Sequence, residues 1–204
     1  MNLQKLFEAQ AELDKHIIEK KGLQGVDLLP NLILALQVEL GECANEWRGF
    51  KHWSEDQNPR YSREEWKIVD DAKVISKFNP SLGTDINYAA VEIVESKPLL
   101  EEYVDCLHFI LSIGNYLGLQ NYSPSFSKVA VNFNGDELLA QWDEIFRAAS
   151  TFKSFHIQDA DVWYSSLFSN FLGLGEMLGF TWKQIEQAYF EKNEVNHQRQ
   201  ESGY

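Results

Sequence analysis

Positive charge is scarce in this sequence, and several familiar signals are missing from it. The chain has 18 Lys and Arg residues against 31 Asp and Glu residues, which gives a net charge of −13. A surface this acidic repels phosphate backbones and anionic lipid, so we expect neither nucleic acid nor membrane as a partner. Because no internal repeat, low-complexity tract or Gly-rich phosphate loop is present, a repeat architecture and a P-loop site are excluded.

Cysteines are few, and long apolar runs are absent. The two cysteines, Cys43 and Cys106, each follow an acidic residue in an apolar segment. We interpret both as small, reduced core residues. The N-terminus has no apolar core of the signal-peptide type, and no apolar run reaches the roughly 18 residues of a membrane span. The sequence therefore predicts a soluble, cytoplasmic protein.

Helical periodicity dominates the chain. A length of 204 residues suits one sizeable domain, which we take as residues 1–204. Apolar residues recur at helical spacing in six segments, residues 2–20, 31–47, 98–118, 137–152, 161–178 and 182–200. Thr181 and Gln184 fit a capping box at the start of the last segment. The prediction is an all-α helical bundle.

Two segments interrupt the periodicity, and we predict that residues 54–97 and 119–160 are insertions within the domain. In the first insertion we expect a short helix over residues 63–76 and a strand over residues 88–94. In the second we expect an extended stretch over residues 128–133. The first insertion would serve to cover the site or to contact a partner.

Acidic residues occur on two apolar segments where a buried helix should have none. Glu39 and Glu42 are three residues apart on one segment, and Glu102 and Asp105 on the other, so each pair projects from one helical face. Carboxylates are rarely buried unless they are paired or bind a metal. Ligands that are all oxygen suit Mg²⁺ or Mn²⁺ rather than zinc. The two pairs therefore predict a box of four carboxylates that holds two divalent ions.

The alternative is that these acids lie on solvated faces of amphipathic helices. For a single glutamate that interpretation would be preferred, but two such pairs on two apolar helices favour the metal site. Glu46 lies on the same stripe as the first pair and is either a further ligand, an acceptor behind the ligands, or a partner of Arg48 or Lys51. Glu101 lies about 100° around the helix from Glu102 and is the weaker candidate.

A polar stripe on the last predicted helix carries the opposite charge. Lys192, Asn193, Asn196 and Arg199 occupy positions i, i+1, i+4 and i+7. Arginine offers forked donors to phosphate oxygens, and lysine offers a mobile point charge. A basic stripe near a C-terminus is more often a solvated face. Beside a carboxylate box in an acidic protein, we interpret this one as a clamp for a triphosphate.

These motifs resemble a known family. The two acidic pairs are similar to the metal motif of the all-α nucleoside triphosphate pyrophosphohydrolases, the superfamily of MazG and the dimeric dUTPases. Three further segments resemble the dimeric dUTPases: Gln10-x-x-Leu13-Asp14, residues 45–53, and the run from Lys192 to Tyr204. The two insertions are similar to those of phage-encoded members.

The resemblance implies an all-α homodimer that hydrolyses dUTP, and dUDP as a further substrate, with Mg²⁺ or with Mn²⁺ in its place. The products from dUTP would be dUMP and pyrophosphate, formed through a metal-activated water, which limits uracil incorporation into DNA. The implied metal ligands are Glu39, Glu42, Glu102 and Asp105, with Glu39 and Glu42 also catalytic. The implied substrate-binding residues are Gln10, Asp14, Lys51, His52, Trp53, Lys192, Asn193, Asn196 and Arg199.

Two departures from the family pattern concern the base. Relatives often offer a pair of amides to the uracil edge, whereas this chain has Asp14 in the second place. The stacking aromatic residue is a tryptophan in some relatives, and here that place falls on His52. One alternative function is a broader house-cleaning dNTP pyrophosphatase. Another is an interaction module whose insertions bind a repressor, as some phage relatives do.

Overall fold

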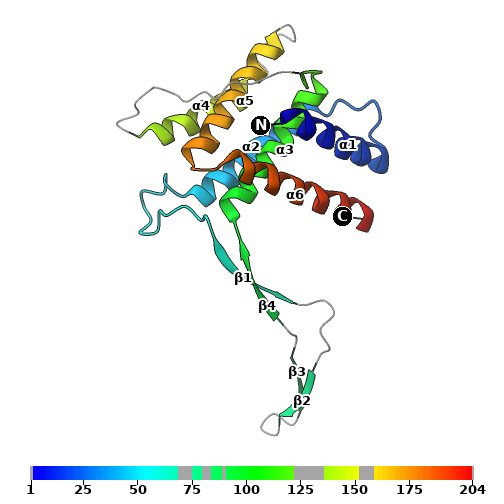
Figure 1. Ribbon diagram of the computed structural model, residues 1–204, viewed down its shortest axis with the longest axis vertical. Helices are drawn as coiled ribbons and strands as arrows, with labels where there is room; N and C mark the ends of the chain where they lie inside the picture. Colours follow the sequence, from blue (N-terminus) through cyan, green and yellow to red (C-terminus); the bar gives the residue numbers. More distant parts are fainter. Residues whose placement is uncertain are drawn as a thin grey trace.

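The computed structural model describes residues 2–68, 75–79, 84–88, 91–121, 136–151 and 159–203. This part of the chain forms six α-helices and two small antiparallel sheets of two strands each. The helices gather into one body, from which the strands extend as a long ribbon (Figure 1). The predicted all-α bundle is therefore confirmed. None of the helices in the described residues combines the length and apolarity needed to cross a membrane.

All six predicted helices are present, within a few residues of their expected bounds. They are α1 (Leu3–Lys21), α2 (Leu29–Trp47), α3 (Pro98–Tyr116), α4 (Glu137–Thr151), α5 (Ala160–Met177) and α6 (Trp182–Ser202). The capping box at the start of α6 forms as predicted, because Thr181 Oγ1 accepts from the Gln184 amide while the Gln184 side chain accepts from the Thr181 amide. α1 ends at Gly22, whose positive φ of 67° suits a residue without a side chain.

α3 is the central helix of the body. It contacts α1, α2, α5 and α6, and most of its side chains are buried. Tyr103 stacks on Phe171 of α5 with ring centroids 4.3 Å apart, and its hydroxyl donates to the Phe171 carbonyl. A side chain at Gly175 would meet the Tyr103 hydroxyl at 2.4 Å, so this contact requires glycine. Since α3 carries one acidic pair, its burial also positions the site.

The first insertion contains strands, and the helix predicted over residues 63–76 is wrong. β1 (Arg63–Ile68) pairs with β4 (Val91–Ser96), and β2 (Ile75–Asn79) pairs with β3 (Thr84–Tyr88). Arg63 lies opposite Ser96 at the end nearer to the helices. The helical periodicity of this segment is weak, and ladder bonds to a distant partner strand outweigh it. The strand predicted over residues 88–94 overlaps the end of β3 and the start of β4.

The second predicted insertion contributes to the core. It contains α4, which packs on α2 and α5 and buries Trp142 and Ile145. The Trp142 ring lies 5.7 Å from that of Trp47 at the end of α2. The extended stretch predicted over residues 128–133 lies outside the described residues.

Candidate active site

Three of the four predicted metal ligands meet between α2 and α3. Glu39 projects from α2, and Glu102 and Asp105 project from α3. One carboxylate oxygen of each lies within 4.8 Å of those of the other two. All three side chains are partly buried. We call these three residues the carboxylate cluster.

Glu42 lies at the edge of this cluster. It is one turn from Glu39 on α2, and its side chain is exposed. Its charge is nonetheless close enough to raise the pKa of both Glu39 and Glu102. The structure thus brings three of the four acids within ligand distance and leaves the fourth beside them, on the solvent side.

The cluster holds more negative charge than its surroundings compensate. Burial is the largest cause that raises the pKa of Glu39 to about 7, and repulsion from Asp105 and Glu42 adds to it. The pKa of Glu102 is raised to about 7 by the same causes. Burial also raises the pKa of Asp105, against the opposing effect of Lys192. Because the donor atoms are all oxygens and lie within 4.8 Å of one another, they fit a hard divalent cation such as Mg²⁺ or Mn²⁺.

A cavity of about 770 Å³ lies beside the cluster, between α1, α2, α3 and α6. Glu39 and Asp105 border it. Three residues of the stripe on α6, Lys192, Asn196 and Arg199, border it as well, whereas Asn193 is buried and does not. Apolar side chains complete the wall, among them Ile17, Ile18, Leu28, Leu32 and Phe109. A cavity with carboxylates, cations and an apolar wall can bind a charged ligand that has one flat, uncharged part.

A network of polar side chains lies on the α1 and α3 walls of the cavity. The Gln10 amide nitrogen donates to Asp14 Oδ1 and Ser112 Oγ at 2.9 Å each, and Ser112 Oγ donates to Asp14 at 2.8 Å. The Gln10 oxygen accepts from the Tyr189 hydroxyl at 2.9 Å and lies 2.7 Å from His108 Nδ1. Both predicted base readers on α1, Gln10 and Asp14, therefore belong to one connected group.

The protonation states of this network follow from burial. Desolvation lowers the pKa of His108 to about 3, so the imidazole is neutral at pH 7. Since an amide oxygen can only accept, Nδ1 carries the proton. The buried Nε2 carries a lone pair that has no hydrogen-bond partner among the described residues. Burial also raises the pKa of Asp14, while the hydrogen bonds from Gln10 and Ser112 lower it.

Sequence reasoning missed His108, Phe109 and Ser112, which all border the cavity. A signal for two of them was present. His108 and Ser112 follow Asp105 at i+3 and i+7, so they share its helical face. Polar residues on the same face as the metal ligands of a buried helix could have been included in the site.

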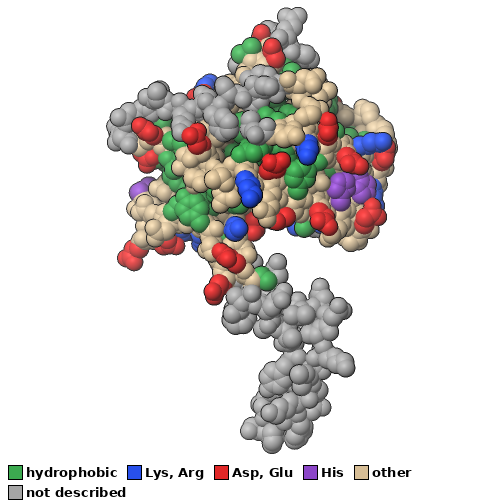
Figure 2. Space-filling view, in the orientation of Figure 1, with side chains coloured by type: hydrophobic (Ala, Val, Ile, Leu, Met, Phe, Trp, Pro, Cys, Tyr) green, Lys and Arg blue, Asp and Glu red, His purple; other side chains and the backbone are tan. Residues whose placement is uncertain are grey.

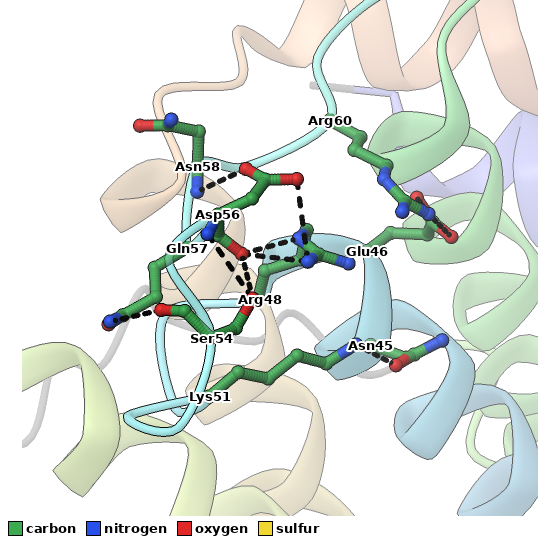
Figure 3. A network of polar contacts seen from close by, with 9 residues as sticks. All are labelled: Asn45, Glu46, Arg48, Lys51, Ser54, Asp56, Gln57, Asn58 and Arg60. Atoms are coloured by element: carbon green, nitrogen blue, oxygen red, sulfur yellow. Dashed lines mark hydrogen bonds and ion pairs between the residues drawn. The ribbon is translucent and has the colours of Figure 1, made fainter.

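The loop after α2 does not reach the cavity. Lys51, His52 and Trp53 do not line it; Lys51 instead donates to Asn45, and 67% of Trp53 is exposed. Figure 3 shows the network that orders this loop, in which Arg48 donates to the Asp56 carbonyl at 2.7 Å.

Glu46 belongs to the same loop network. It pairs with Arg60 at 3.0 Å, whereas Arg48 pairs with Asp56, so the predicted pairing of Glu46 with Arg48 or Lys51 is wrong (Figure 3). Its roles as a further ligand or as an acceptor behind the ligands stay predictions. The Arg60 carbonyl also accepts a hydrogen bond from the Leu99 amide, at the start of α3. Glu46 thereby fixes the path of the loop as it returns to the bundle.

Comparison with known proteins agrees with this geometry. A family model described as dUTPase matches residues 2–98 and 89–204, two overlapping matches that together take in nearly the whole chain. No curated protein matches the chain. The matched residues include both helices of the carboxylate cluster and all helices around the cavity. The chain therefore belongs to the all-α, dimeric dUTPase family and is by class a dUTP diphosphatase.

Proposed function

We propose that the chain hydrolyses dUTP to dUMP and pyrophosphate in a Mg²⁺-dependent reaction in the cytoplasm, and so limits uracil incorporation into DNA. The observation that carries the proposal is the carboxylate cluster, whose oxygens lie within 4.8 Å of one another beside a cavity of about 770 Å³. The same cavity is bordered by Lys192 and Arg199, which suit an anionic substrate. Mn²⁺ has the same ligand preference and would substitute.

In this proposal the four acids hold the divalent ions. Glu39, Glu102 and Asp105 are the ligands, and Glu42 joins them from the edge of the cluster. When bound, the ions supply activation of the attacking water and neutralisation of charge on the phosphates. Glu39 or Glu42, the two acids on α2, would orient that water and accept its proton through a carboxylate oxygen.

The remaining cavity residues bind the rest of the nucleotide. Lys192, Asn196 and Arg199 contact phosphates and sugar, and Asn193 supports them from the buried side of α6. Gln10 and Asp14 face the base, together with His108 and Ser112. Rejecting thymine means excluding one methyl group, which is worth about 1–3 kcal/mol unless the wall is rigid. The hydrogen bonds within this network support such rigidity.

Lys51, His52 and Trp53 remain predicted substrate residues, and a homodimer is the arrangement in which they would act. Their loop would then serve the cavity of the partner subunit. An exposed apolar stripe on α2 supports a second copy there, since Leu34 is 61% exposed and Val38 51% exposed. We expect a dimer in light scattering, and a monomer for the double variant Leu34→Glu/Val38→Glu. A wild-type monomer would exclude this arrangement.

Pyrophosphate release tests the proposed reaction. We would measure dUTP, dTTP, dCTP and UTP, each with Mg²⁺ and with EDTA, and dUDP by phosphate release. Turnover confined to the uracil deoxynucleotides and abolished by EDTA and by Asp105→Asn is the expected result. Glu101→Gln, an exposed site on the same helix, is the matched control and should keep full activity. Turnover of several dNTPs would instead support the broader pyrophosphatase.

The ribbon of strands favours a second role as an interaction module. β1 and β4 carry the chain well away from the helices, and β2 and β3 extend further (Figure 1). Such a projection suits a protein partner, with a repressor as the candidate from the resemblance. Replacing residues 63–96 by a short linker should leave dUTP hydrolysis intact and abolish capture of that partner. Loss of hydrolysis would place the ribbon in the catalytic unit.

A further inference from the structure

Two histidines face each other where α1 meets α6. His16 lies on α1 and His197 on α6, 181 positions apart in sequence, and their Nδ1 atoms are 3.1 Å apart. The ring centroids are 5.3 Å apart, so the two nitrogens lie between the rings. Figure 2 shows a histidine patch on this face, bordered by acidic side chains. Neither histidine lines the cavity, so the pair is separate from the candidate active site.

A carboxylate fixes the protonation of one ring. Glu201 Oε1 lies 3.1 Å from His16 Nε2, and its second oxygen lies 3.8 Å from Lys20. Because a carboxylate accepts, Nε2 of His16 carries a proton, and the Nδ1 of the neutral ring is a lone pair directed at His197. Metal-binding histidines in proteins are commonly held in this way, with the far nitrogen donating to a carboxylate.

The distance between the two Nδ1 atoms also fits a metal ion. Imidazole nitrogens lie about 2.0–2.1 Å from a tetrahedral zinc ion, which places two such nitrogens roughly 3.3 Å apart. Without metal, this 3.1 Å contact is a hydrogen bond in which His197 Nδ1–H donates to His16 Nδ1. An ion would replace it: the proton of His197 moves from Nδ1 to Nε2, and both rings turn so that their Nδ1 lone pairs converge on the ion. Imidazole favours zinc, copper and nickel over Mg²⁺, which prefers oxygen.

We propose that His16 and His197 form a second metal site, specific for a transition-metal ion of the Zn²⁺ class and distinct from the carboxylate cluster. The ion takes Nδ1 of both rings, and water completes its coordination. Glu201 orients His16 without touching the ion. The site lies next to Asn196 and Arg199, which border the cavity. A bound ion would therefore hold the substrate-binding end of α6 against α1.

Calorimetric titration of the full-length protein with ZnCl₂ at pH 7.5, in excess Mg²⁺, tests this site. Mg²⁺ occupies the oxygen ligands, so zinc bound under these conditions reports the imidazoles. We expect one Zn²⁺ per chain, and an affinity at least about tenfold weaker in both His16→Gln and His197→Gln. His52→Gln, which removes an exposed histidine elsewhere, should bind zinc as the wild type does. No zinc binding by the wild type, or equal binding by His197→Gln, would overturn the proposal.

Three further measurements guard against misfolded variants and against zinc at the carboxylate cluster. Glu201→Gln changes an exposed residue that touches neither lone pair, and it should weaken zinc binding about tenfold. Asp105→Asn should bind zinc as the wild type does; loss of zinc in this variant alone would assign the ion to the cluster and overturn the proposal. Zinc should also raise the melting temperature of the wild type but not of His197→Gln, since only the folded chain brings the two rings together.

Discussion

The ammonium group of Lys192 donates a hydrogen bond to Asp105 Oδ2 at 2.5 Å, which ties α6 to the carboxylate cluster. This contact places a cation where a divalent ion would bind. Lys192 therefore has two opposing effects, because it offsets the negative charge of the cluster and competes with metal for Asp105. A substrate phosphate that enters the cavity would offer Lys192 an alternative partner.

Lys192→Met separates these effects by removing the charge while keeping most of the side-chain volume. Loss of one charge-assisted hydrogen bond to phosphate costs about 1.5–3 kcal/mol, so kcat/KM for dUTP should fall roughly 10- to 100-fold. Mg²⁺ affinity should stay equal or rise, because Asp105 no longer pairs with a cation. Steady-state kinetics and magnesium titration measure the two effects, with Lys183→Met on the exposed side of α6 as control. Weaker Mg²⁺ binding in Lys192→Met would contradict the competition.

Proton release on binding Mg²⁺ is the second prediction. Without metal, Glu39 and Glu102 have pKa values of about 7, so both are partly protonated at neutral pH. A divalent ion requires the ionised form and displaces these protons, so Mg²⁺ affinity should rise between about pH 6 and pH 8. Calorimetry at pH 7 in two buffers of different ionisation enthalpy measures the protons released. Glu102→Gln should release fewer, and a wild type that releases none would contradict the raised pKa values.

The same pKa values determine how the metal-free protein responds to alkali. Folding raises the pKa of both acids above the ordinary value of 4.5, so the folded state is favoured when they are protonated. Their contribution to stability is therefore present below about pH 4.5 and lost as the pH rises through 7. Excess Mg²⁺ should restore the lost stability above pH 7, which urea unfolding with and without EDTA would detect.

His108 gives a pH dependence of opposite sign. Its pKa falls from 6.5 to about 3 on folding, so the neutral ring stabilises the fold above pH 6.5, and that contribution is lost as the pH falls toward 3. One group contributes a slope of at most about 1.4 kcal/mol per pH unit. The difference in unfolding free energy between wild type and His108→Gln should therefore shrink between pH 6.5 and pH 4. A difference that stays constant over this range would exclude His108 as the titrating group.

The helices and the carboxylate cluster could be predicted from the sequence because their signals are local. Apolar spacing and the Thr181 capping box indicate the helices, and two acidic pairs on apolar helices indicate the cluster. The strands β1 to β4 could not be predicted in the same way, since their pairing joins residues up to 33 positions apart, as between Arg63 and Ser96.

Tertiary contacts account for the other differences at the site. Glu46 pairs with Arg60, which lies in a loop 14 positions later, so no helical spacing could identify this partner. The network from Gln10 to His108 joins α1 to α3 across 98 positions. Burial of both helices against each other brings it together, and no pattern within either helix alone shows that the two faces meet.

The contact between Gly175 and Tyr103 makes a final prediction about the bundle. Gly175→Ala places a methyl group at 2.4 Å from the Tyr103 hydroxyl and 2.7 Å from its ring, so α5 must move from α3 or the ring must turn. Such overpacking costs about 1–3 kcal/mol of unfolding free energy. Tyr103→Phe alone loses the hydrogen bond to the Phe171 carbonyl, about 0.5–1.5 kcal/mol. Because the double variant lacks the clashing hydroxyl, it should lose less stability than the two single variants combined. Strictly additive losses in urea unfolding would show that the methyl group and the hydroxyl do not meet.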